Sequence, residues 1–308
     1  MTSPRVVGDP EIAQAAIALT DIYDLIVEGF VLQAQGAVEF PPKLGIHPRP
    51  GAFLHVMPAY LPTHNLAGTK LVSVYPDNPA QGLPAMSGMI LMMDPATGVI
   101  THQLDAVWIT KIRTAMVSMV NAKLLANPQP VFGVIGATGI VGRAHLETIA
   151  AVFPGSRVLV HSRSPERLAA LLTEMADQPI ELVAAASDEA IVRNCDVPIV
   201  CTTFVPEPIL RSSWIHPGQT ILNVHNLGWP GDVLSVVDRV CCDDRRQVME
   251  PSSGLCQRYT GLDPDLELCE VVSGARPGRD HPDQTIFCLD YGLAIFDILL
   301  AGLVLKAL

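Results

Sequence analysis

Basic residues are scarce in this sequence, which has 20 lysines and arginines against 31 aspartates and glutamates. The formal net charge of −11 argues against nucleic acid as a partner, because nucleic-acid binding demands basic patches, and against an anionic membrane surface. Apolar runs of membrane-spanning length are lacking too: the most apolar stretch, Ala294–Leu308, is too short and is interrupted by Asp297. We predict that this stretch is a buried packing helix and that neither nucleic acid nor a membrane is a partner.

Paired cysteine motifs are also absent. The 7 cysteines are odd in number, lie mostly in apolar segments and show no CxxC spacing. This pattern predicts reduced, buried thiols and a cytoplasmic protein. The N-terminal segment MTSPRVVGDPEIAQ lacks the basic-then-apolar pattern of a signal peptide, in line with that expectation. His47, His55 and His64 have no metal-ligand spacing, so we predict no metal.

What the sequence does contain is enough apolar material for a sizeable core, with 308 residues of which 49% are hydrophobic. A helical pattern over Glu11–Gln35 is followed by short apolar stretches, and the turn Asp94–Gly98 joins the last two. This succession predicts a mostly antiparallel sheet with one helix on it. The expected strands are Phe53–Pro58, Thr69–Tyr75, Ser87–Met93 and Val99–Leu104.

A second long helix, expected over Ala106–Ala126, leads to the linker Asn127–Pro130, after which strands and helices alternate. Alternation at this spacing predicts a doubly wound parallel sheet with right-handed crossovers. The fold class is therefore α/β, with a Rossmann-type sheet beside a smaller α+β layer. The expected strands are Val131–Ile135, Val158–His161, Ile180–Ala184, Val197–Thr202, Thr220–Val224 and Val240–Asp243.

The segment Val131–His145 (VFGVIGATGIVGRAH) is the strongest motif in the chain. Its apolar run breaks into Gly136, Gly139 and Gly142 and then restarts as a helix, which predicts a strand, a tight turn and a helix N-terminus that bind a pyrophosphate. Glycine suits this turn because a Cβ would hold the phosphates away from the backbone N–H groups. The residues expected to contact the coenzyme are Gly136, Thr138, Gly139, Ile140 and Val141.

The next strand ends at Ser162, Arg163 and Ser164, where NAD-binding proteins usually carry an acid. An arginine between hydroxyl groups suits a 2′-phosphate, so NADP(H) is favoured and NAD(H) is left open; the alternative is that Arg163 is a solvated loop residue. Thr202 and Thr203 end the fourth parallel strand, where ligands bind in this fold, and either contact the coenzyme or cap the strand.

Three basic residues stand out because their neighbours are apolar: Lys70 in GTKLVSV, Arg113 in WITKIRTAMVSMV, and Arg49 just before GAFLHVMP. Long cations on such segments are seldom buried without an anion, so together they are candidates to hold a substrate carboxylate. The alternative is that each reaches solvent or pairs with one of the acidic residues.

Five segments of the chain resemble, in the same order, the ornithine cyclodeaminase/mu-crystallin family. They are GTKLVSVYPDNPAQGLP, DPATG, LDAVWITKIRTAMVSMVNAKLLA, the glycine turn with GRAH, and GLAIFD. The resemblance implies a Rossmann dinucleotide-binding domain at 128–288 and a substrate-binding and dimerisation domain formed by 1–127 and 289–308. It also implies a homodimer.

The resemblance further implies which side chains meet the substrate. The family's carboxylate-binding residues match Lys70, Arg113 and Arg49, with Lys70 and Arg113 as the expected catalytic residues, and Met57 would line the pocket. The aspartate that cyclodeaminases use as general base aligns with Gly228, which cannot exchange a proton. Ala85 stands where the family has a threonine, and the glycine turn is one residue longer than usual.

Ketimine reductases of the mu-crystallin type lack that aspartate and reduce an imine that is already formed. The resemblance therefore implies an NAD(P)H-dependent reductase of small cyclic imino acids, of the Δ1-pyrroline-2-carboxylate type, or a related amino-acid dehydrogenase. Two alternatives stay open: an ornithine cyclodeaminase with bound NAD and a relocated base, and a non-catalytic NADP-binding carrier or structural protein. Lys70 or water would deliver the proton, with Asp232 and His225 as further candidates.

Overall fold

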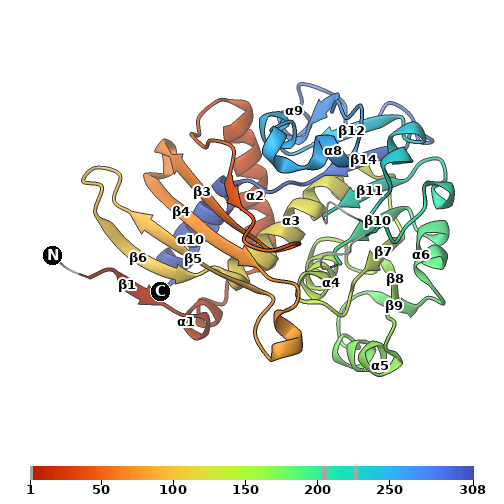
Figure 1. The fold of residues 1–308 in the computed structure, drawn as a ribbon, viewed down its shortest axis with the longest axis horizontal. Coiled ribbons are helices and arrows are strands. Elements are labelled where there is room, and N and C mark those ends of the chain that lie inside the picture. The colour runs from red at the N-terminus through yellow and green to blue at the C-terminus, as the bar shows by residue number, and fades with distance from the viewer. Residues whose placement is uncertain (1–2, 203–206, 225–227) are drawn as a thin grey trace. The chain divides into compact units, whose positions relative to one another are not determined.

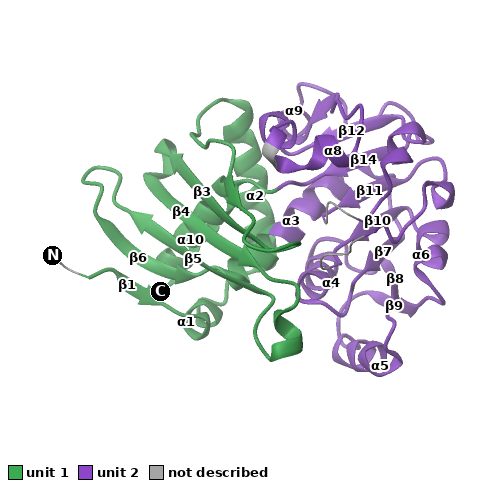
Figure 2. Cartoon of the chain, viewed as in Figure 1, with its two compact units in different colours: residues 1–113, 292–308 green, residues 114–291 purple. Residues whose placement is uncertain are grey.

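The computed structural model describes residues 3–202, 207–224 and 228–308. The chain divides into two compact units, which we call unit 1 (residues 1–113 and 292–308) and unit 2 (residues 114–291; Figure 2). The division into compact units falls inside helix α3, Val107–Leu125, after Arg113, whose Nε donates to Asp297 of the same unit.

Unit 1 is built on a six-stranded sheet in the order β1-β6-β5-β4-β3-β2 (Figure 1). The pairs from β2 to β6 are antiparallel, which confirms the predicted sheet, and β1 adds to its edge in parallel with β6. β1 and β2 are three-residue strands that the sequence pattern did not reveal. The strands are β1 Arg5–Val7, β2 Leu44–Ile46, β3 Phe53–Leu61, β4 Leu66–Val74, β5 Met86–Met93 and β6 Ile100–Asp105.

The first helical segment forms two helices, α1 (Asp9–Gln14) and α2 (Leu19–Ala34), and the single helix expected over Glu11–Gln35 is wrong. The chain turns at Ala16, whose φ of 47° is left-handed and cannot continue a right-handed helix. The apolar pattern runs through this break, so periodicity alone does not reveal it.

The C-terminal segment forms the predicted packing helix, α10 (Ala294–Ala307), which is drawn in blue across the strands of unit 1 in Figure 1. Two glycines let it approach closely. A Cβ on Gly68 of β4 would lie 2.9 Å from the Cδ1 atom of Ile298, and one on Gly29 of α2 would lie 2.7 Å from the ring of Phe296. The core of unit 1 therefore lies between α10, α2 and one face of the sheet.

Unit 2 is a wholly parallel eight-stranded sheet in the order β13-β12-β14-β11-β10-β7-β8-β9, which confirms the α/β prediction. From β7 the chain adds β8 and β9 on one side and then returns to add β10 on the other side of β7, so the strand order reverses between β7 and β10. Ligands bind at such a switch point in this class of fold. Two of its strands, β13 and β14, were not expected. The strands are β7 Phe132–Ile135, β8 Arg157–His161, β9 Glu181–Ala184, β10 Val197–Val200, β11 Thr220–Asn223, β12 Arg239–Cys242, β13 Leu266–Glu267 and β14 Ile286–Leu289.

The helices of unit 2 lie in the connections between its strands. They are α4 Ile140–Val152, α5 Pro165–Glu174, α6 Asp188–Asn194, α7 Arg245–Val248, α8 Leu255–Arg258 and α9 Leu268–Val272. Among the described residues, no helix combines the length and apolar character that a membrane span needs. All seven cysteines are free, and six of them are buried.

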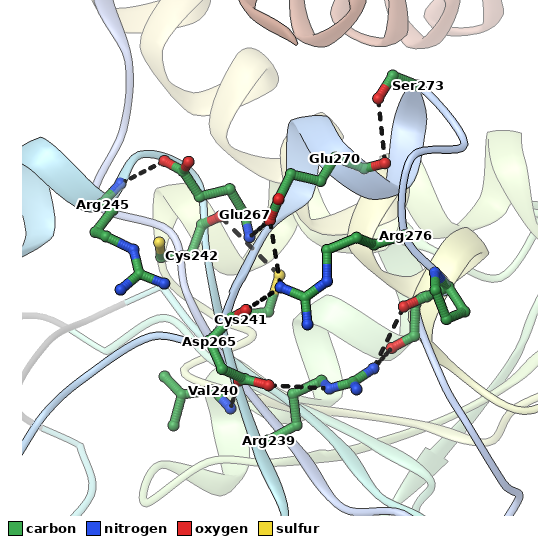
Figure 3. Close-up of polar contacts among 12 residues, drawn as sticks. Arg239, Val240, Cys241, Cys242, Arg245, Asp265, Glu267, Glu270, Ser273 and Arg276 are labelled. Atoms are coloured by element: carbon green, nitrogen blue, oxygen red, sulfur yellow. Dashed lines mark hydrogen bonds and ion pairs between the residues drawn. The ribbon is translucent and has the colours of Figure 1, made fainter.

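The β13 edge of this sheet is covered by ion pairs (Figure 3). Arg239 contacts Asp265 at 3.3 Å and Asp280 at 2.7 Å, and Arg276 contacts Glu270 at 3.6 Å. Short, charged edges resist pairing with another chain, so this network protects the end of the sheet.

Candidate functional site

The glycine turn of unit 2 joins β7 to α4 and has no room for side chains. Gly136 has a φ of 89°, and a Cβ there would lie 2.9 Å from the carbonyl oxygen of Cys201, after β10. A Cβ on Gly142 would collide with the Gly136 carbonyl oxygen. Gly139 is the N-cap of α4 and has no side chain, so the N-cap residue does not occupy the first N–H groups of this helix.

These features fit a dinucleotide. Backbone N–H groups at the start of a 13-residue helix attract phosphate, and the turn lies at the switch point of the sheet. Beside it, the buried hydroxyl oxygen of Thr202 has no hydrogen-bond partner among the described residues, which a ligand would supply. Thr138 and Val141 are half-buried and Ile140 is exposed, while Thr203 lies outside the described residues.

Ser162 and Arg163 follow β8 in the same unit. Ser162 Oγ accepts a hydrogen bond from the Ser164 backbone N–H at 3.2 Å, and Arg163 is exposed in the loop before α5. The sequence did not reveal that His161, the last residue of β8, contacts Asp188 at 2.9 Å. These two residues are 27 positions apart, and the packing of α6 (Asp188–Asn194) beside β8 brings them together.

A second candidate site, in unit 1, consists of Lys70 on β4, Arg113 on α3 and Asp297 on α10. Lys70 Nζ donates to Asp297 Oδ1 at 2.7 Å, and Arg113 Nε donates to the same oxygen at 3.1 Å. Lys70 and Asp297 are 0% exposed and Arg113 is 7% exposed. The structure thus brings together two of the predicted cations and pairs them with Asp297.

Burial lowers the pKa of Lys70 from its ordinary value of 10.5 to about 8. The neighbouring guanidinium of Arg113 contributes to this lowering, and the carboxylate of Asp297 opposes both effects. His55, on β3, has its pKa lowered to about 3, first by burial and then by the charges of Lys43, His47 and Lys70. The imidazole of His55 is therefore neutral at physiological pH.

Of the two other residues predicted to contact the substrate, Met57 lies near Lys70 and Arg49 does not. Met57 on β3 is buried and lies directly opposite Lys70 in the β3–β4 register, so the two side chains share one face of the sheet. Arg49 is exposed in the turn between β2 and β3, and within the described residues it makes no ion pair. The structure places Met57, and not Arg49, with the buried cluster.

The remaining candidates lie in unit 2. Asp232 accepts a hydrogen bond from the Ser212 hydroxyl at 2.6 Å, and the carbonyl oxygen of Gly228 accepts backbone N–H bonds from Ile209 and Leu210. His145 is fully buried, and burial lowers its pKa to about 4. His225 lies outside the described residues.

Comparison with known proteins decides the family. The model of the ornithine cyclodeaminase/mu-crystallin family matches residues 9–308. The chain belongs to this family. Its relatives in the family include nodulation efficiency protein NfeD of Rhizobium meliloti, 33% identical over 85% of this chain and 82% of that protein. They also include mouse (Mus musculus) ketimine reductase mu-crystallin, 30% identical over 82% and 79%.

Among solved structures, the family fold is matched by Δ1-pyrroline-2-carboxylate reductase of Thermococcus litoralis, determined with NADH and L-proline. The TM-score is 0.84 at 25% sequence identity, with 98% of this chain and 97% of that chain covered. This likeness confirms the α/β fold with a Rossmann-type sheet.

The lowered pKa of Lys70 predicts a pH dependence of stability. Because the folded state loses this proton near pH 8 and the unfolded state near 10.5, the unfolded state binds more protons in between, and stability rises with pH. We expect the difference in unfolding free energy between the wild type and Lys70→Met to grow in favour of the wild type over that interval. Urea denaturation at several pH values measures it, with the exposed Lys306→Met as control. A difference that is flat or falls with pH would contradict the lowered pKa.

Proposed function

We propose that this chain is an NAD(P)H-dependent reductase of small cyclic imino acids, of the Δ1-pyrroline-2-carboxylate or Δ1-piperideine-2-carboxylate type, or a closely related amino-acid dehydrogenase. The observation that carries the proposal is the buried cluster of Lys70, Arg113 and Asp297. The names of the mouse and Thermococcus relatives, a ketimine reductase and a pyrroline-2-carboxylate reductase, support it.

The cluster is suited to a carboxylate in both charge and hydrogen bonding. Two cations share one carboxylate, so one positive charge is in excess. The Lys70 ammonium has three N–H groups and, among the described residues, one acceptor, Asp297 Oδ1. Arg113 uses only its Nε toward that oxygen. A substrate carboxylate would neutralise the excess charge and accept the remaining N–H groups, the guanidinium binding it in a bidentate manner.

The residues of the glycine turn would hold the nicotinamide coenzyme, which when bound supplies the hydride for imine reduction. Lys70 and Arg113 would fix the substrate carboxylate and so orient the imine carbon, and positioning of this kind supplies much of the acceleration of such reactions. With a pKa of about 8, Lys70 still carries a proton at neutral pH and is a suitable donor toward the substrate nitrogen.

We expect purified protein to consume NADPH in the presence of a five- or six-membered cyclic ketimine and to release no ammonia from ornithine with NAD. Ammonia release without net change of coenzyme would indicate a cyclodeaminase instead. Tight NADPH binding without turnover of any ketimine or amino acid would indicate a carrier.

In the same assay, Arg113→Met should lower kcat/KM for the ketimine by at least roughly 30-fold, because truncating one member of a buried charge pair removes about 2 kcal/mol or more. Arg5→Leu, which removes an exposed arginine of the same unit, is the matched control. An unchanged kcat/KM in Arg113→Met would remove Arg113 from the proposed site.

NADP(H) is the coenzyme we favour, because the loop after β8 presents Arg163 next to Ser162 and Ser164. A hydrogen bond to a charged group contributes about 1.5–3 kcal/mol, so Arg163→Ala should weaken NADPH binding roughly 10- to 150-fold. NADH binding should change little. Fluorescence titration of both coenzymes measures this, with the exposed Arg167→Ala as control, and equal losses for NADPH and NADH would contradict an NADP preference.

We also propose a homodimer formed through the face of the unit 1 sheet opposite Lys70. This face, which we call the outer face, exposes several large apolar side chains, and exposed apolar patches mark interaction surfaces. Met89 is 38% exposed and Ile46 is 61% exposed. The others are Leu44, Tyr60, Met93 and Ile100.

The dimer prediction is tested by the mass in solution. We expect the wild type to have twice the chain mass of 33.0 kDa, and the double variant Ile46→Asp/Met89→Asp to be a monomer, because buried unpaired carboxylates would oppose association. Light scattering after size exclusion measures both. Val236→Asp, at an exposed apolar position of unit 2, is the control, and a dimer that persists in the double variant would exclude the outer face.

A further inference from the structure

Asp297 has one carboxylate oxygen that its partners do not use. Both Lys70 and Arg113 donate to Oδ1, while Oδ2 is buried and has no hydrogen-bond partner among the residues that the structure describes. Asp297 lies in the first turn of α10, and the rest of that turn is apolar. A charged oxygen left without a donor in such surroundings is unfavourable, so a partner for it is to be expected.

Neutralising the two cations does not explain this arrangement. Arginine and carboxylate pair best through two parallel hydrogen bonds that use both oxygens, yet Arg113 reaches Asp297 through Nε alone. Lys70 adds its bond to the oxygen that is already occupied. Neither Lys70 nor Arg113 therefore donates a hydrogen bond to Oδ2.

We propose that Asp297 Oδ2 accepts a hydrogen bond from the N–H of the substrate nitrogen. The cluster would then present donors to the carboxylate, from Lys70 and Arg113, and an acceptor to the nitrogen two bonds away. An α-amino or α-imino acid carries that combination of groups, whereas a simple carboxylic acid lacks the donor. This inference rests on the proposed function and specifies which atom of the site recognises nitrogen.

The contact has a consequence for the chemistry. In reduction of a protonated imine, the hydride would come from the bound nicotinamide coenzyme, whose C–H bond breaks and which is oxidised. A C–H bond forms at the imine carbon, the π bond of C=N breaks, and its electron pair moves to nitrogen, which keeps the proton it already carries. Oδ2 would stabilise the protonated, electrophilic form before hydride arrives. An aspartate on α10 would thereby contact the nitrogen in a chain whose glycine at position 228 cannot do so.

The test compares two ligands of the NADPH-saturated protein: L-proline, and cyclopentanecarboxylate, in which carbon replaces the nitrogen. A charge-assisted hydrogen bond contributes about 1.5–3 kcal/mol, so the wild type should bind L-proline roughly tenfold or more tightly by calorimetry. In Asp297→Asn we expect this preference to vanish, while cyclopentanecarboxylate binds as well as before or better because the cluster gains positive charge.

Asp94→Asn, in an exposed turn of the same unit, is the matched control and should keep the preference. Equal weakening of both ligands in Asp297→Asn would overturn the proposal and indicate a structural role alone. If Asp297→Asn does not fold, the wild type still decides, because equal affinity for the two ligands overturns the proposal and leaves the reductase function standing. A wild type that binds neither ligand and reduces no ketimine overturns the proposed function, and this inference with it.

Discussion

One carboxylate oxygen shared by two buried cations organises unit 1. Asp297 Oδ1 joins β4 to α3 and α10 through Lys70 and Arg113, across sequence separations of 227 and 184 residues. Removing one member of a buried ion pair typically destabilises a protein by about 3–5 kcal/mol, because the other charge is left uncompensated. The close approach of α10 at Gly68 follows from the same requirement, since the helix must reach the sheet for Asp297 to meet Lys70.

The proposed binding site of unit 2 depends on glycines, which have no side chains. At Gly136 the backbone after β10 comes so near that a Cβ has no room, and at Gly139 the helix begins without a side chain that would occupy its N–H groups. In unit 1 the candidate ligand contacts are charged side chains that hold one another in place. In unit 2 they are backbone N–H groups at the start of α4, which the glycine turn holds in place. In both arrangements the protein's own contacts hold the groups in place, so a ligand bound as proposed would spend little free energy on ordering them.

The sequence allows prediction where the signal is local. Alternating strands and helices predict the parallel sheet, the glycines predict the turn, and apolar neighbours single out Lys70 and Arg113. Features that depend on distant parts of the chain are not predictable in this way: β14 enters the sheet between β11 and β12, and Asp297 meets Lys70 only once α10 has packed. The helix break at Ala16 was missed because no glycine or proline marks it.

Electrostatics also narrows the choice between the reductase and the cyclodeaminase. The substrate of a cyclodeaminase carries a second ammonium group, and the cluster already has one positive charge in excess. The lowered pKa of His55 also indicates an excess of positive charge, since the charges of Lys43, His47 and Lys70 add to burial in lowering it to about 3. A neutral imidazole beside these cations offers no compensation for a further ammonium group. A cyclic imino acid has one carboxylate, which Lys70 and Arg113 can bind, and one nitrogen, which Asp297 can bind. It has no second ammonium group that would add to the positive charge of the cluster.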